Sequence, residues 1–348
     1  MSIAFLFPGR GSQRPGMLHR LPDTAASATV LAEADWALRR LASRTGGGAG
    51  NGAKRGDGDG GDYADGIAEL DSAEALERSP VACHVALLIA GVAGARALME
   101  DEEVRPSYVA GHGAGGYAAA VLADVLTFEE ALRAVRLRGE LMHAAESGDG
   151  PESDVAIRLA QHLATVKRRP QRVRYVGGVQ GRSLFGDTNA VFDDLAWSAA
   201  RPVRWTEVTA VLAEEKVDCC VELPPGRALT GELAAARLPG MQAVSVEEHG
   251  IAEAAELARA AAGIVGGPSS RAIADDEEDM PPGFGPVTGP VTGQGPTAGP
   301  GTGVGPTPGS APGHLPGPGH LPGPGPGPGP GPGPESGPGP GTGQSGFA

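Results

Sequence analysis

A glycine-rich turn between a short apolar run and a helical pattern constrains the fold of this chain more than any other feature. The apolar run occupies residues 106–110 (PSYVA), the turn occupies residues 111–116 (GHGAGG), and apolar residues then recur at helical spacing. Strand, tight turn and helix form the repeating unit of α/β folds, in which helices connect parallel strands. We therefore predict an α/β protein with this turn at the end of a strand.

The rest of the chain repeats the alternation of strands and helices. Short apolar runs that end in turn residues predict strands over 3–7, 172–179 and 219–223. Helical spacing predicts helices over 24–41, 80–99, 155–166, 189–198 and 205–215, with a short helix capped by Asp71 or Ser72 and another from Arg227. The segment 80–99 is apolar on nearly all sides, so we expect it in the core. The predicted fold class is a mainly parallel sheet with helices on both faces.

Glycine and proline divide the chain into two parts. Of the 57 Gly and 32 Pro residues, 46 lie within residues 267–348, which have few apolar side chains to offset the entropy lost on ordering. We predict a folded domain over 1–265 and a disordered Gly/Pro-rich tail over 266–348. A second glycine-rich stretch, residues 44–65, combines glycines with both signs of charge and predicts a mobile surface insertion.

Charge and cysteine content exclude several classes of protein. The net charge of −14 repels polyanions, so we expect no nucleic-acid partner. Cys83, Cys219 and Cys220 form no CxxC pair, which predicts neither a disulfide framework nor a structural zinc site. We find neither eighteen consecutive apolar residues nor a basic segment leading into a cleavage site, so we expect no membrane association and a cytoplasmic location. No cofactor or metal site is predicted.

The glycine-rich turn admits two chemical interpretations. As GxGxxG it matches a dinucleotide-binding fingerprint, which expects an acidic residue at the end of a second strand about twenty positions later. Glu129 and Glu130 stand at that distance, but within a helical pattern that they open. The second interpretation is a nucleophile elbow, GxSxG, in which backbone N–H groups stabilise an oxyanion beside an exposed serine. Gly113 occupies the serine position here.

Three blocks in order resemble the malonyl-CoA:acyl carrier protein transacylase family. They are FPGRGSQRPGM at 7–17, GHGAGGYAA at 111–119 and LTFEEALRAVRLRGELM at 126–142. Further blocks at 17–23, 70–93 and 221–231 (MLHRLPD, LDSAEALERSPVACHVALLIAGVA and VELPPGRALTG) are most similar to the epsilon subunit of biotin-independent malonate decarboxylase. The resemblance extends from Met1 to about Glu248 and implies a hydrolase-like acyltransferase core.

The resemblance also implies roles for individual residues. In the family an elbow serine takes the malonyl group from coenzyme A and passes it to the phosphopantetheine-type thiol of an acyl carrier protein, with a distant histidine as base. By position, Arg138 would pair with the malonyl carboxylate, a bidentate task suited to a guanidinium. The backbone N–H groups of Arg10 and Ala114 would form the oxyanion hole, and His112 would support the elbow.

Two departures from the family pattern bear on catalysis. Gly113 has no hydroxyl, so no acyl-enzyme can form at that position. The small ferredoxin-like subdomain and the catalytic histidine segment of the family are reduced to residues 143–154, of which 144–154 form a shortened linker. His143 and His162 do not align with the lost histidine. We therefore expect a core without most of its small subdomain and without the Ser/His dyad.

Two functions from different classes remain open. The first is a malonyltransferase-like protein that serves malonate decarboxylation, with impaired catalysis and an acyl carrier protein as partner. The second is a non-catalytic subunit that holds a carrier protein or the decarboxylase subunits.

Overall fold

Strands from across the chain form one mainly parallel sheet. The computed structural model describes residues 2–46, 67–148 and 151–263. Within these residues the sheet has six strands in the order β4-β3-β2-β1-β5-β6, and every neighbouring pair except β3–β4 is parallel. The strands are β1 (Ile3–Phe7), β2 (Tyr108–Gly111), β3 (Arg174–Gly177), β4 (Arg182–Ser183), β5 (Cys219–Glu222) and β6 (Gln242–Ser245). The predicted α/β fold with a mainly parallel sheet is confirmed.

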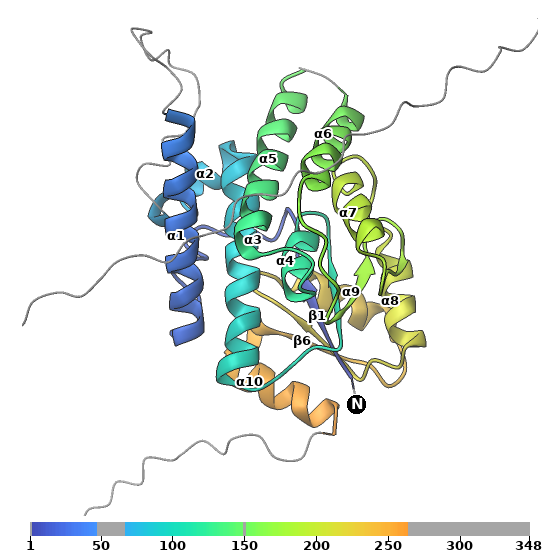
Figure 1. Ribbon diagram of the computed structural model, residues 1–348. Helices are drawn as coiled ribbons and strands as arrows, with labels where there is room; N and C mark the ends of the chain where they lie inside the picture. The colour runs from blue at the N-terminus through green and yellow to red at the C-terminus, as the bar shows by residue number, and fades with distance from the viewer. Residues whose placement is uncertain (1, 47–66, 149–150, 264–348) are drawn as a thin grey trace, which may run out of the picture. The chain divides into compact units, whose positions relative to one another are not determined.

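Helices cover both faces of this sheet (Figure 1). Alternate side chains of β1 divide the core: Phe5 and Phe7 face the larger group of helices, while Ala4 and Leu6 face α8 and α9. The larger group comprises α1 (Ala25–Gly46), α3 (Pro80–Arg96), α4 (Gly115–Leu122), α5 (Phe128–Glu146), α6 (Glu152–Ala164), α7 (Thr188–Trp197) and α10 (Val246–Ala261). The opposite face is covered by α8 (Trp205–Glu214) and α9 (Ala228–Ala236), and the short α2 (Ala73–Arg78), capped by Ser72, precedes α3.

The helix α3 lies in the core, as its composition predicts. Every residue from Pro80 to Ala95 is buried, and the Ser79 hydroxyl caps the helix by accepting the Ala82 N–H. Together with one π-helical turn, Ala97–Asp101, this helix is long and apolar enough to cross a membrane by length and composition alone. Because 94% of its most apolar window is buried inside the protein, it packs as a core helix.

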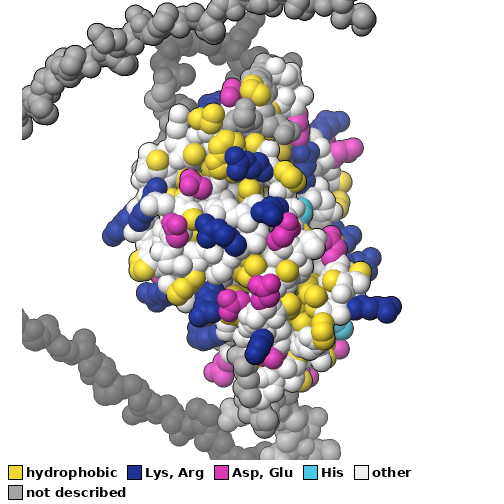
Figure 2. All heavy atoms as spheres, turned by 90° about the vertical axis from the view of Figure 1, so that its right-hand side faces the viewer, with side chains coloured by type: hydrophobic (Ala, Val, Ile, Leu, Met, Phe, Trp, Pro, Cys, Tyr) yellow, Lys and Arg dark blue, Asp and Glu magenta, His cyan; other side chains and the backbone are white. Residues whose placement is uncertain are grey.

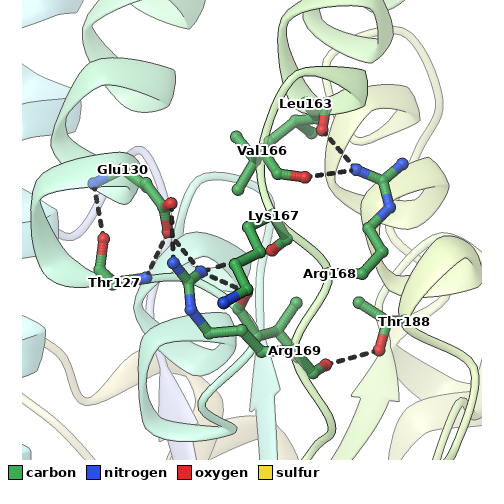
Figure 3. Close-up of polar contacts among 9 residues, drawn as sticks. Thr127, Glu130, Leu163, Val166, Lys167, Arg168, Arg169 and Thr188 are labelled. Carbon is green, nitrogen blue, oxygen red and sulfur yellow. Dashed lines mark hydrogen bonds and ion pairs between the residues drawn. The ribbon is translucent and has the colours of Figure 1, made fainter. Parts of the chain in front are cut away.

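The start of α5 is tied to the segment that leads into β3 (Figure 3). Thr127 and Glu130 form a capping box, in which each side chain bonds the backbone N–H of the other residue. Arg169 then pairs with both carboxylate oxygens of Glu130, at 2.6 and 2.9 Å, and its carbonyl accepts the Thr188 hydroxyl. The expectation that Glu129 and Glu130 open this helix is confirmed.

The surface over α6, α7 and α8 carries both signs of charge. Figure 2 views the protein from this side and shows basic side chains interspersed with acidic ones. Exposed ion pairs join Arg172 to Asp124, Arg174 to Glu215 and Arg204 to Glu207. The basic side chains of this side therefore alternate with acidic ones and form no continuous field.

Several predicted boundaries can be compared with the structure. Residues 147–151 alone separate α5 from α6, which leaves no room for a folded subdomain between these helices. The helix α1 continues to Gly46, so the first three residues of the predicted insertion at 44–65 are helical. The rest of that insertion, residues 47–65, and the predicted tail at 266–348 lie outside the described residues.

Three elements of the fold, β4, β6 and α10, were not predicted from the sequence. β4 has two residues, and β6 has a single apolar residue between its Ala and Ser neighbours, so neither presents a long periodic pattern. The helical run of α10 is interrupted at Gly250, which has φ of 74°. All three elements nevertheless complete the sheet and its cover.

Candidate functional site

The turn between β2 and α4 has the backbone of a nucleophile elbow. Gly113 lies at its tip with φ of 55°, in the left-handed region. The His112 N–H donates to the Phe7 carbonyl at 2.9 Å, and the His112 carbonyl accepts the Gly115 N–H at 3.0 Å. The Gly116 N–H donates to the Gly113 carbonyl at 3.1 Å. These bonds fix a sharp strand-to-helix turn directly beside the end of β1.

Gly111 and Gly115 allow the close packing of this turn, whereas Gly113 has open space where a side chain would begin. A Cβ at Gly111 would lie 2.2 Å from the Gly116 nitrogen, and one at Gly115 would lie 2.2 Å from the Phe7 carbonyl oxygen. A Cβ at Gly113 would meet nothing within 4 Å. The position that a nucleophile would occupy is therefore sterically open but carries no reactive atom.

The loop after β1 lies against the elbow and carries the second predicted oxyanion donor. A Cβ at Gly9 would lie 2.3 Å from the His112 carbonyl oxygen, so the two backbones are in direct contact. Within the described part of the chain, neither the Arg10 N–H nor the Ala114 N–H donates a hydrogen bond. Neither predicted donor is therefore used to hold the turn together. Their assignment as an oxyanion hole remains a prediction.

His112 is held by packing. Its ring lies edge-on to Trp205, with 5.9 Å between the ring centroids. Burial lowers the pKa of His112, while the charge of Glu232 opposes that shift. The supporting role of His112 at the elbow stays a prediction.

Arg138 is a buried cation without a carboxylate partner in the described structure. Its side chain is 4% exposed, and burial lowers its pKa, although a guanidinium stays protonated. Nη1 donates to His84 Nε2 at 2.9 Å and to Met142 Sδ at 3.0 Å, and Nη2 donates to the Ser198 carbonyl at 3.1 Å. The Nε–H has no acceptor. Because burial of an unpaired charge is unfavourable, this arrangement is typical of a site that binds an anion.

The close approach of α3 and α5 brings Arg138 to His84. A Cβ at Gly139 would lie 2.5 Å from the Val81 Cα, so glycine is required where the two helices touch. Arg138 precedes that contact in α5, and His84 follows Val81 by one turn of α3. His84 was not among the residues predicted from the sequence. A single histidine within a helix of otherwise apolar residues was the available signal.

Arg10 adds a second positive charge near this site. Its guanidinium pairs with Glu146 at 2.6 Å, and both side chains are about half exposed. Burial is the largest cause of the lowered pKa values of His84 and Arg138, and the charge of Arg10 lowers both further. The Arg10 loop therefore connects the elbow to the surroundings of Arg138.

Burial makes the cysteine thiols poor nucleophiles, and the described residues form no metal cluster. Cys83 is buried, which raises the pKa of its thiol to about 11, and burial raises the pKa of Cys219 to about 12. His143 and His162 lie in the last turns of α5 and α6. No group of three His, Cys, Asp or Glu side chains in the described part is placed to hold a metal ion.

Comparison with known proteins identifies the family. The family model of the acyl transferase domain matches residues 4–215 of this chain. These residues include β1, the elbow and Arg138. The chain belongs to the acyl transferase domain family. Among relatives of this acyl transferase domain, the spectinabilin polyketide synthase system protein NorA' of Streptomyces orinoci is 30% identical over 245 residues, which is 67% of this chain and 6% of that protein. The malonyl CoA-acyl carrier protein transacylase PksC of Bacillus subtilis is 28% identical over 148 residues, 42% of each chain.

Solved structures show the same fold. An acyl carrier protein S-malonyltransferase from Vibrio cholerae matches with a TM-score of 0.56 and 22% identity, over 71% of this chain and 97% of that one. A malonyl-transacylase solved in complex with a type II polyketide synthase acyl-carrier protein matches with a TM-score of 0.58 and 23% identity, over 74% and 99%. The acyl transferase domain spans less than half the length of the curated relatives named above.

Proposed function

We propose that this acyl transferase domain binds malonyl thioesters through Arg138 and forms no acyl-enzyme. The observation that carries the proposal is the combination of a buried guanidinium without a carboxylate partner and an elbow whose tip is Gly113. The first feature supports recognition of a carboxylate. The second removes the atom that would attack the thioester.

Recognition of a malonyl group is supported by charge and by relatives. Malonyl-CoA has a free carboxylate, which can form a charge-assisted pair with Arg138, whereas acetyl-CoA has none. PksC and the two solved structures are named for malonyl transfer. The N–H groups of Arg10 and Ala114, which donate no hydrogen bond in the described structure, would donate to the thioester carbonyl oxygen.

The absence of acylation is supported by the side chains around the turn. Gly113 supplies no hydroxyl, and the raised pKa of Cys83 keeps its thiol protonated. The interval that would carry the family's catalytic histidine is a short connection between α5 and α6. We infer that the domain holds or presents malonyl thioesters and does not turn them over.

The partner that we propose is an acyl carrier protein with a phosphopantetheine-type thiol. The support is the complex of a related malonyl-transacylase with its carrier protein. We propose malonate decarboxylation as the setting because of the sequence blocks at 17–23, 70–93 and 221–231, with decarboxylase subunits as further partners in the cytoplasm. Malonyl-CoA is a ligand in this proposal, and the domain needs no cofactor of its own.

Incubation with malonyl-CoA, followed by intact-mass measurement, tests the proposal. The parent protein should keep its unmodified mass and should transfer no malonyl group to a holo carrier protein. Gly113→Ser should remain far below normal rates, because the missing general base is typically worth about 10²–10⁴-fold. Robust transfer by the parent would contradict the proposal and would require another nucleophile.

A non-catalytic scaffold that binds no thioester is the second candidate. The observation in its favour is the 4% exposure of Arg138, which a ligand could reach only by moving a neighbouring group. Calorimetric titration with malonyl-CoA separates the two candidates, because a scaffold of this kind would release no heat of binding.

A further inference from the structure

We infer that His84 is a positioning residue that holds the Arg138 guanidinium in place for a ligand carboxylate. This inference rests on the proposed binding of malonyl thioesters. It adds a specificity-determining side chain on α3, opposite the helix that carries Arg138.

The contact between His84 and Arg138 is buried and directional. The His84 side chain is 1% exposed and the Arg138 side chain is 4% exposed, so water does not compete for this hydrogen bond. The bond joins residues 54 positions apart and links α3 to α5. It therefore fixes the guanidinium relative to a second core helix.

The donor properties of arginine determine the state of His84. A guanidinium has only N–H donors, so His84 Nε2 must accept the bond and the ring proton must lie on Nδ1. In a protonated imidazole both ring nitrogens carry protons, so neither can accept a hydrogen bond from Arg138. Such a ring would also be a second cation beside Arg138 and near Arg10. His84 thus holds Arg138 only as a neutral ring with its proton on Nδ1.

The other two hydrogen bonds that Arg138 donates differ in strength. The Ser198 carbonyl is a fixed backbone acceptor on Nη2, whereas Met142 Sδ is a weak acceptor on a flexible side chain. A ligand carboxylate would displace the methionine at the smallest energetic penalty. His84 and Ser198 would then keep the guanidinium in place while Nε, which has no acceptor, bonds the ligand.

Three variants test this inference by calorimetric titration with malonyl-CoA and with acetyl-CoA. His84→Leu removes the acceptor at similar volume, and His84→Gln keeps an acceptor oxygen at similar reach. His162→Leu is the matched control, because His162 is a half-buried helical histidine without a hydrogen bond to Arg138 in the described structure. The readout is the ratio of the two dissociation constants, which a general loss of stability would not change selectively.

The parent should prefer malonyl-CoA by roughly 10–100-fold, as expected for a charge-assisted pair in a partly desolvated site. His84→Leu should reduce that preference about tenfold, and His84→Gln should retain most of it. His162→Leu should match the parent. A parent preference that persists in His84→Leu would overturn the role of His84 alone. Equal binding of both thioesters by the parent would overturn the proposed function and this inference with it.

Nitrogen NMR of the parent protein gives a second test, which needs no variant and so does not depend on whether a variant folds. Neutral His84 with its proton on Nδ1 is the expected result. A proton on Nε2, or a doubly protonated ring at neutral pH, would overturn the inference.

Discussion

The β2–α4 turn and the surroundings of Arg138 are held together by different kinds of group. The turn is made of backbone, and its bonds from His112, Gly115 and Gly116 need no reactive side chain. The Arg138 site is made of side chains from α3 and α5, with one backbone carbonyl. The turn therefore keeps its shape without a reactive side chain at position 113, whereas the carboxylate recognition that we propose requires the guanidinium itself.

The largest effect is expected from Gly111→Ala. Its Cβ would lie 2.2 Å from the nitrogen of the buried Gly116, and a backbone atom cannot move aside alone, so the turn must break or shift. We expect a loss of about 4 kcal/mol or more in the free energy of unfolding, measured by chemical denaturation. Gly113→Ala is the matched control, because its Cβ meets nothing and only the left-handed backbone opposes it, by about 1–2 kcal/mol.

Equal destabilisation by these two alanine substitutions would show that the turn is not packed as described. It would also remove the distinction between Gly111, which the close packing of the turn requires, and Gly113 at its tip.

A smaller effect, confined to binding, is expected from Arg138→Met. The preference for malonyl-CoA over acetyl-CoA should fall by roughly 10–100-fold, since the charge-assisted pair contributes about 1.5–3 kcal/mol. The free energy of unfolding should stay within about 1 kcal/mol of the parent, because relief of a desolvated charge offsets the lost hydrogen bonds. Titration and denaturation of the same samples measure both quantities.

Arg136→Met provides the control from the same helix, since Arg136 pairs with Glu140 at the surface of α5. It should leave the preference unchanged. An equal loss of preference in both variants would mean that the net charge of α5, and not the Arg138 site, selects the ligand.

The pH dependence of stability gives the third comparison. Burial, with the charges of Arg138 and Arg10, holds the pKa of His84 well below its usual 6.5 in the folded protein. As the pH falls below about 6.5, His84 therefore binds a proton in the unfolded chain but not in the folded chain. The free energy of unfolding decreases over that range. The loss reaches at most about 1.4 kcal/mol per pH unit for one group.

His84→Gln lacks this titration and should lose less stability than the parent between pH 7 and pH 5. Denaturation midpoints at both pH values measure the difference. An identical pH dependence of the two proteins would show that His84 is protonated with similar affinity in both states, contrary to its buried contact with Arg138.

The sequence was sufficient to predict the elements with strong periodicity. The apolar run and glycines at 106–116 specify the strand and turn, and residues 126–142 specify α5 with Arg138 on it. The apolar composition of 80–99 placed α3 in the core. These features are local, so neighbouring residues determine them.

The contacts of the site could not be predicted in the same way. The bond between His84 and Arg138 depends on the packing of α3 against α5 at Gly139, which no local pattern encodes. The Ser198 carbonyl reaches Arg138 from 60 positions away. Family resemblance predicts a binding role for Arg138, but only the folded structure shows which groups hold its side chain.

Equilibrium dialysis with radiolabelled malonyl-CoA, sampled before and after an acid quench, tests the central claim most directly. Before the quench, the parent protein should retain label in excess of free ligand, and Arg138→Met should retain much less. After the quench, the precipitated parent should carry no label, because Gly113 offers no atom for an ester. Label that survives the quench, or no retained label before it, would contradict recognition without acylation.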